Sequence, residues 1–237
     1  RFLQEHDIGF HASTGVVVPI VPSAVTFDLD VGKPRIYPDD QMGFDACRAL
    51  SDEPSPQGAV GVGIGATCGK VLGSDCAMRG GLGTASARLP GGVVVGALAV
   101  CNAWGDVLDP RSGAVLAGAR DPGRSGRFLD TERYMCERTG LQTRYFGMDT
   151  TLCVVATNAP FSREQTTKIA MMAQDGIARA VRPSHTMYDG DVVFALSSGK
   201  QGQAIDVNIA GTTAARLVSE AILRGVCAAN QLEQPST

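Results

Sequence analysis

The sequence is poor in the residue types that build several common kinds of site. Aromatic residues make up 5% of the 237 residues, and there are three histidines and one tryptophan. His6, His11 and His185 do not have metal-ligand spacing, so we expect no metal centre. A formal net charge of −3 argues against nucleic acid as a partner, because phosphate binding requires a basic face. No apolar run reaches the roughly 18 residues of a membrane-spanning helix, which argues against membrane insertion.

Cysteine pairs and a targeting segment are also lacking. The seven cysteines are odd in number and form no CxxC motif, and several lie in apolar runs. This pattern predicts reduced, buried thiols in a cytoplasmic protein. No basic-then-apolar signal opens the chain. The first residue is Arg1, within a stretch typical of the end of a helix, and we therefore expect further sequence upstream of it.

What the chain has is an ordinary globular composition and much glycine. Hydrophobic residues make up 44% and charged residues 19%, and a chain of this length can form one substantial core. We therefore expect a single domain over residues 1–237. Glycine is abundant, with 29 residues, and alternates with valine or isoleucine from residue 58 to 65. The alternation predicts a strand at 59–66, one face of which lets a neighbouring backbone or a ligand approach closely.

Hydrophobic periodicity predicts alternating strands and helices. Residues 14–29 are typical of extended structure interrupted by two prolines. Further strands are expected at 83–88, 92–102, 150–159 and 191–199. Helices are expected at 39–50, 162–181 and 211–226, the second beginning with a capping box of Ser162 and Gln165. Residues 105–146 are rich in glycine, arginine and aspartate, and we interpret them as a long mobile connector. The alternation predicts an α/β layered domain.

The residues Asp149, Thr150 and Thr151 directly precede one of the predicted strands. A threonine hydroxyl is a weak nucleophile, and the α-amine of a chain that begins with this threonine can act as its base. The hydroxyl can release that amine itself, by attacking the preceding carbonyl in an N-to-O acyl shift that ends in hydrolysis. This needs a strained or mobile segment before the threonine and a rigid strand behind it. A polar turn that precedes the core is the competing interpretation.

Three other stretches lack residues that a P-loop, a serine triad or a calcium-binding loop requires. The stretch GVGIGATCGK is not a P-loop, because Ile64 stands where the motif requires its first glycine. His185 has no serine-triad signature beside it, so we interpret it as a structural histidine. Residues 189–191 lack the remaining ligands of a calcium loop.

Six stretches follow one another over nearly the whole chain: GVVVPIVPSAVTFDL, GAVGVGIGATCGK, GGLGTASARL, VVGALAVCNAWGDVLDP, DTTLCVVATNA and RPSHTMYDGDVVFAL. They resemble the P1 family of peptidases, which includes DmpA-like L-aminopeptidases/D-esterases, β-peptidyl aminopeptidases and NylC-like 6-aminohexanoate-oligomer endohydrolases. The stretches IYPDDQMGFDA and PQG are most similar to the NylC-like branch. The resemblance implies a four-layer α/β/β/α sandwich of the DmpA and ornithine acetyltransferase type, with the N-terminal part of the fold missing from this chain.

The resemblance also implies a self-processing amide hydrolase. The bond between Asp149 and Thr150 would be cut, giving residues 1–149 and 150–237, and Thr150 would form the acyl-enzyme. The implied substrates are small amides or peptides, including nylon oligomers. The resemblance implies no cofactor and no metal. It implies a homo-oligomer, often a tetramer of cleaved pairs.

Four further residues match the family's site. Lys70 is similar to the lysine beside the family nucleophile, where a cation can lower the pKa of the amine or orient the hydroxyl. Asn102 matches the asparagine that donates a hydrogen bond to the developing oxyanion. Asp189 and Asp191 match the acidic pair that orients the amine or hydroxyl. Two residues apart in an extended chain, their side chains point the same way, so we expect both to face Thr150.

The sequence departs from the family pattern in two respects. Asp149 stands where members often have asparagine or glycine, and members carry further residues before the segment that matches Arg1. Two alternatives therefore stay open. One is acyl transfer like that of ornithine acetyltransferase, and the other is a non-catalytic remnant of the fold.

Overall fold

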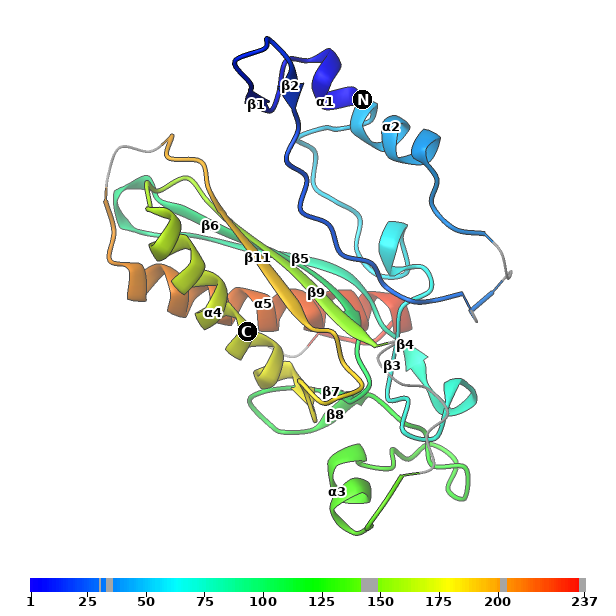
Figure 1. Cartoon of the computed structure of the whole chain (residues 1–237). Coiled ribbons are helices and arrows are strands. Elements are labelled where there is room, and N and C mark those ends of the chain that lie inside the picture. Colours follow the sequence, from blue (N-terminus) through cyan, green and yellow to red (C-terminus); the bar gives the residue numbers. More distant parts are fainter. Residues whose placement is uncertain (30, 33–35, 142–148, 201–203, 235–237) are drawn as a thin grey trace. The chain divides into compact units, whose positions relative to one another are not determined.

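The computed structural model describes residues 1–29, 31–32, 36–141, 149–200 and 204–234 (Figure 1). The chain divides into two compact units. The first comprises residues 1–25 and 29–55, and the second comprises residues 26–28 and 56–237. The predicted cleavage into 1–149 and 150–237 stays a prediction.

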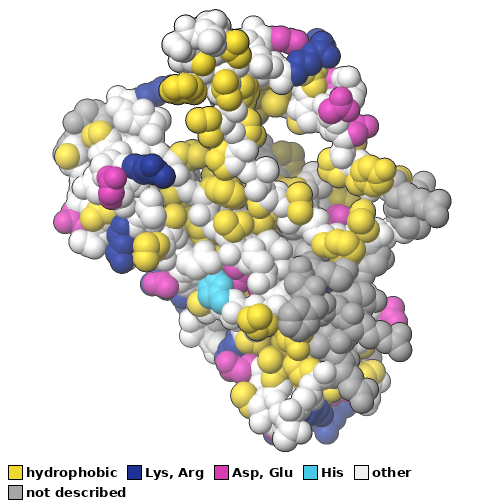
Figure 2. All heavy atoms as spheres, in the orientation of Figure 1, with side chains coloured by type: hydrophobic (Ala, Val, Ile, Leu, Met, Phe, Trp, Pro, Cys, Tyr) yellow, Lys and Arg dark blue, Asp and Glu magenta, His cyan; other side chains and the backbone are white. Residues whose placement is uncertain are grey.

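The first unit is built from short elements. Its helices are α1 (Phe2–Glu5) and α2 (Asp40–Arg48), and its strands β1 (Phe10–His11) and β2 (Val17–Val18) pair antiparallel. The helix predicted at 39–50 is confirmed, and Asp39 caps it by accepting from Met42 N. Of the extended segment predicted at 14–29, only β2 is a strand. None of the described residues of this unit is buried, and hydrophobic side chains are visible on the surface drawn in Figure 2. Among its described residues, the unit therefore has no core of its own.

The second unit is organised around a four-stranded mixed sheet. Its strands lie in the order β11-β9-β6-β5 and span Val192–Ser197, Thr150–Thr157, Val94–Asn102 and Gly81–Arg88. β11 runs parallel to β9, and the other neighbours are antiparallel. Two long helices, α4 (Arg163–Ala180) and α5 (Val207–Asn230), pack together on one face of the sheet (Figure 1). The predicted strands at 83–88, 92–102, 150–159 and 191–199 are confirmed.

Alternation of side chains along the strands places the core between the sheet and the helices. In β9, every second residue from Thr151 to Thr157 is buried, and the residues between them are half-buried. The helices contribute Ile169, Ile177, Leu217 and Ile222, all buried, as the helical periodicity predicts. The predicted capping box at the start of α4 is present. β6 alternates in the same way over its first half and is buried on both faces only in its last residues.

The prediction of a strand at 59–66 is wrong. This segment contains the 3₁₀ turn η1 (Gly61–Gly63) and irregular backbone, and the strand β3 (Thr67–Cys68) follows, paired with β4 (Met78–Arg79). Its glycines have different surroundings. A Cβ on Gly63 would lie 2.5 Å from Leu82 N, one on Gly65 would clash with the Asp28 side chain, and one on Gly61 would meet nothing within 4 Å. Close approach of backbone, as the sequence predicts, therefore explains Gly63.

The segment expected to be a long mobile connector, 105–146, contains regular elements in its described part. This segment contains β7 (Asp106–Leu108), β8 (Val115–Ala117) and α3 (Thr131–Cys136). β7 lies between β8 and β10 (Val181–Arg182) in a three-stranded antiparallel sheet. Two more 3₁₀ turns, η2 (Ser74–Cys76) and η3 (Pro90–Gly92), complete the unit. Residues 142–146 of the predicted connector lie outside the described residues.

All seven cysteines are free, and four of them are buried: Cys68, Cys101, Cys153 and Cys227. The prediction of buried, unpaired thiols is confirmed for these four. Burial raises the pKa of Cys101 to about 12, which keeps this thiol protonated. Among the described helices, none combines the length and the apolar character that crossing a bilayer requires.

Candidate active site

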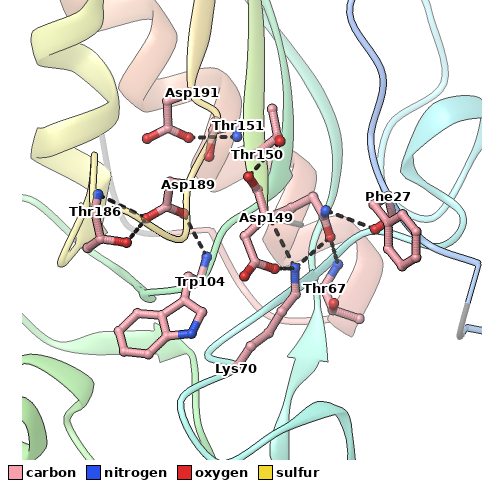
Figure 3. Close-up of polar contacts among 11 residues, drawn as sticks. Phe27, Thr67, Lys70, Trp104, Asp149, Thr150, Thr151, Thr186, Asp189 and Asp191 are labelled. Atoms are coloured by element: carbon pink, nitrogen blue, oxygen red, sulfur yellow. Dashed lines mark hydrogen bonds and ion pairs between the residues drawn. The ribbon is translucent and has the colours of Figure 1, made fainter. Parts of the chain in front are cut away.

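The predicted site residues meet at one end of the central sheet, because three strand ends coincide there. Thr150 is the first residue of β9 and lies directly opposite Asn102, the last residue of β6. β11 runs parallel to β9, so residues 189–191, which precede β11, come to the same end. Figure 3 shows Thr150, Asp189 and Asp191 close together at this end of the sheet. Hydrophobic pattern fixes the strands, and strand pairing then brings distant residues together.

The Thr150 hydroxyl contacts the main-chain carbonyl of the preceding residue, Asp149. Thr150 Oγ1 donates to the carbonyl oxygen of Asp149 at 2.6 Å, and the Gly190 N–H donates to the same oxygen at 2.7 Å. The Asp149 N–H in turn donates to the carbonyl of Tyr188 at 3.3 Å, so Asp149 is held on both sides like a residue of an added parallel strand. Gly190 allows this approach because a Cβ there would lie 3.1 Å from Thr150 Oγ1.

Lys70 places a positive charge beside the side chain of Asp149. Its Nζ pairs with Asp149 Oδ1 at 2.5 Å and donates to the Asn102 main-chain and side-chain oxygens at 3.0 and 2.8 Å (Figure 3). The Lys70 side chain is 13% exposed and the Asp149 side chain 5%. The backbone of Lys70 is fixed as well, since its N–H donates to the carbonyl of Trp104 at 2.9 Å. The pair is therefore a buried, positioned ion pair.

Asn102 is completely buried and is held by three partners besides its strand. Its Oδ1 accepts from Thr67 N at 3.0 Å as well as from Lys70, and its Nδ2 donates to the carbonyl of Phe27 at 3.3 Å. The amide oxygen of Asn102 thus positions Lys70. The role of Asn102 as an oxyanion donor stays a prediction.

Asp189 supports the turn that carries Gly190. Its Oδ1 accepts from Trp104 N at 3.1 Å, and its Oδ2 accepts from the hydroxyl of Thr186 at 2.6 Å and from Thr186 N at 3.2 Å. Burial raises the pKa of this carboxyl, and the nearby charge of Asp191 adds to the rise, while the hydrogen bonds oppose it.

Asp191 links the site to a histidine. Its Oδ1 accepts from Thr151 N at 2.7 Å, and its Oδ2 lies 2.8 Å from His185 Nδ1 and accepts from His185 N at 3.2 Å. The Thr151 side chain points to the opposite face of β9 from Thr150, and its buried Oγ1 has no hydrogen-bond partner within the part of the chain that the structure describes.

The hydrogen bonds of Asp189 and Asp191 go to backbone N–H groups, to Thr186 and to His185, and it is Gly190, between them, that reaches the Asp149 carbonyl. That the two carboxylates orient the Thr150 amine or hydroxyl stays a prediction. No sequence signal identifies a backbone N–H as a donor. His185, read from the sequence as structural, adjoins Asp191 and is 36% exposed. Within the described ranges, no group of three His, Cys, Asp or Glu side chains is suited to hold a metal ion.

Comparison with known proteins identifies the family. The model of peptidase family S58 matches residues 2–237. The chain belongs to this family. It is 38% identical over 229 residues to an uncharacterized aminopeptidase of Mycobacterium leprae, covering 93% of this chain and 61% of that protein. It is 30% identical over 197 residues to the 6-aminohexanoate-oligomer endohydrolase of Paenarthrobacter ureafaciens, covering 82% of this chain and 53% of that one.

Among solved structures, a Burkholderia sp. beta-aminopeptidase aligns with a TM-score of 0.50 at 22% identity. The alignment covers 80% of this chain and 49% of that one, so the two share a mixed α/β fold over about half of the larger protein. The chain thus spans about half to three fifths of the length of these three proteins.

Proposed function

We propose that this S58 member is a self-processing amide hydrolase whose nucleophile is Thr150. The observation that carries the proposal is the pair of donors on one carbonyl oxygen. The hydroxyl of Thr150 and the N–H of Gly190 both reach the oxygen of Asp149, at 2.6 and 2.7 Å. The hydroxyl thus lies beside the bond that the N-to-O shift would break, and a backbone donor lies where negative charge would develop.

Self-cleavage would proceed in two steps. Thr150 Oγ attacks the carbonyl carbon of Asp149, the C–N bond to Thr150 breaks, and the hydroxyl proton passes to the leaving nitrogen. The product is an ester between the Asp149 acyl group and Thr150 Oγ. Water then attacks the ester carbon, the C–Oγ bond breaks, and Asp149 leaves with a new carboxyl group. Thr150 keeps a free α-amine and a free hydroxyl.

Hydrolysis of an external amide repeats both steps: Thr150 Oγ attacks the amide carbon and the C–N bond breaks, and water then hydrolyses the resulting ester. The Thr150 amine accepts the hydroxyl proton and returns it to the leaving amine. Lys70 supplies a buried positive charge beside the amine, held in place by Asn102. Asn102 Nδ2 has a second hydrogen beyond the one that Phe27 accepts, and we assign it, with the Gly190 N–H, to the substrate oxyanion. Asp189 and Asp191 position the segment that carries Gly190.

The wider organisation follows the family. We infer a four-layer α/β/β/α sandwich, of which the sheet with α4 and α5 supplies two layers. We infer a homo-oligomer of cleaved pairs in the cytoplasm. The names of the relatives, aminopeptidase and 6-aminohexanoate-oligomer endohydrolase, favour small peptides or linear amides as substrates. The proposed site needs no cofactor, because its chemistry is carried by side chains, a terminal amine and backbone N–H groups.

Intact mass spectrometry of the purified protein tests the proposal. The wild type is expected to give two fragments that meet between Asp149 and Thr150. Thr150→Ala is expected to stay uncut, since it has no nucleophile. Thr151→Ala is the matched control, because its side chain lies on the other face of the strand, and it is expected to be cut. An uncut wild type, or a Thr150→Ala chain that is still cut at this bond, would overturn the assignment.

A further inference from the structure

The uncut chain contains a residue bound in the position of an acyl substrate. Asp149 supplies the acyl half of the bond that Thr150 faces. Its carbonyl accepts from the Gly190 N–H at 2.7 Å, its N–H donates to the Tyr188 carbonyl at 3.3 Å, and its carboxylate pairs with Lys70 at 2.5 Å. Its side chain is 5% exposed. Backbone and side chain of this residue are both held.

If Thr150 cleaves the chain as proposed above, the position of Asp149 indicates where the acyl group of an external substrate binds. The N-to-O shift gives an ester in which Asp149 is the acyl group and Thr150 Oγ the alcohol. The acyl-enzyme formed from an external amide is the same kind of ester on the same oxygen. The pocket that surrounds the Asp149 side chain is therefore the pocket for the first side chain of an external acyl group.

Hydrolysis of the ester changes the surroundings of Lys70. The Asp149 carbonyl carbon must leave Thr150 before another amide can react there, and its side chain moves away with it. Among the described residues, the oxygens that then remain within hydrogen-bond distance of Lys70 Nζ are the two neutral ones of Asn102. A cation that is 13% exposed and lacks a counter-charge favours an anion that can reach it.

We infer that the mature enzyme prefers amides whose acyl side is an aspartyl residue, with Lys70 as the residue that determines this specificity. The carboxylate on the β-carbon of such a residue reaches Lys70 as the carboxylate of Asp149 does. An asparaginyl group has the same shape without the charge. A lysyl group brings a second cation to Lys70 and is disfavoured. Gly190 and Tyr188 pair with the backbone of any acyl residue and do not discriminate among side chains.

The experiment compares the p-nitroanilides of aspartate, asparagine, alanine and lysine on the self-cleaved wild-type protein. Each is used with a free and with an acetylated α-amine, because the Tyr188 carbonyl can accept from either. Release of nitroaniline gives kcat/KM for each compound. The aspartyl compound is expected to exceed the asparaginyl one by about tenfold or more, the range for a hydrogen bond between charged partners. The lysyl compound is expected to be the slowest.

Three results would overturn the inference in different ways. If mass spectrometry shows cleavage at Thr150 and the asparaginyl or alanyl compound reacts as fast as the aspartyl one, the acidic specificity is refuted and the proposed function stands. If the protein is uncut and hydrolyses none of the eight compounds, the proposed function fails and the specificity fails with it. A self-cleaved protein that favours the lysyl compound would refute the role given to Lys70.

Discussion

Substituting Gly190 by proline removes one donor from the Asp149 carbonyl, and the ring carbon that replaces the N–H hydrogen also pushes on that carbonyl oxygen. Proline has no N–H, so the hydrogen bond of 2.7 Å is lost. Removal of one oxyanion donor costs about 10²–10³ in rate, or about 2.7–4 kcal/mol in the barrier. Gly190 is outside the set of glycines with a left-handed φ, so its backbone does not exclude proline on that ground. We expect the half-time of self-cleavage to lengthen by about a hundredfold or more.

Gly190→Ala is the matched control for this variant. It keeps the N–H, and its added Cβ lies 3.1 Å from Thr150 Oγ1, a contact that the hydroxyl relieves by shifting a few tenths of an ångström. We expect a slowing of less than about tenfold, because the donor is retained. Both variants are followed by intact mass spectrometry over time after a short pulse of expression, beside Thr150→Ala as the uncut reference.

Circular dichroism of each variant must match that of Thr150→Ala, so that slow cleavage is not the result of misfolding. A folded Gly190→Pro chain that is cut at the wild-type rate would refute the role given to this N–H. So would a Gly190→Ala chain that is slower than Gly190→Pro, because the side chain and not the donor would then decide the rate. The expected order is wild type, alanine, proline.

Three further measurements test other parts of the structure. Asp149→Asn, made in Thr150→Ala so that the chain stays uncut, leaves Lys70 without its counter-charge. It should lower the free energy of unfolding in urea by about 2 kcal/mol, and a loss below about 0.5 kcal/mol would contradict the buried pair. Burial raises the pKa of Asp106 above its ordinary 3.8, so the folded state holds this proton more tightly than the unfolded chain does. The contribution of Asp106 to the free energy of unfolding is therefore greatest below about pH 3.8 and declines as pH rises through the raised pKa. The difference in the free energy of unfolding between the wild type and Asp106→Asn should shrink as pH rises. A difference that grows with pH would contradict this. Cys101, with a pKa of about 12, should react with a thiol reagent at neutral pH only in denaturant, whereas the exposed Cys136 should react in the folded protein; equal rates would show that the core opens readily.

The central sheet could be predicted from the sequence because its strands are long and apolar. Strands at 92–102 and 150–159 have a hydrophobic pattern strong enough to fix their limits near Asn102 and Thr150. The site then follows from pairing, since these two residues are opposite one another in the antiparallel register. The pairing itself is not visible in a single sequence. The family resemblance supplied it by naming the residues that must come together.

The segments that were predicted wrongly are held by contacts that leave no periodic signal. Residues 106–131 have an ordered course around the buried carboxylate of Asp106, which accepts from Ala119 N at 2.8 Å, from Thr131 N at 2.7 Å and from the Thr131 hydroxyl at 2.8 Å. These partners are 13 and 25 residues away along the chain. One buried acid thus organises a stretch whose composition is typical of a mobile loop. A buried aspartate has the same letter as a solvated one, so only tertiary structure distinguishes them.

The burial of Asp149 likewise changes how this departure from the family pattern is interpreted. In the sequence it is a departure from the asparagine or glycine that the family often carries, and it favours a remnant that has lost its activity. In the structure its carboxylate pairs with Lys70, the cation that the same resemblance places beside the nucleophile. Asparagine at this position would keep a hydrogen bond but no charge, and glycine would keep neither. The acid is thus matched to its surroundings, and under the aspartyl specificity proposed above the departure from the family pattern is a difference in the acyl group rather than decay of the site.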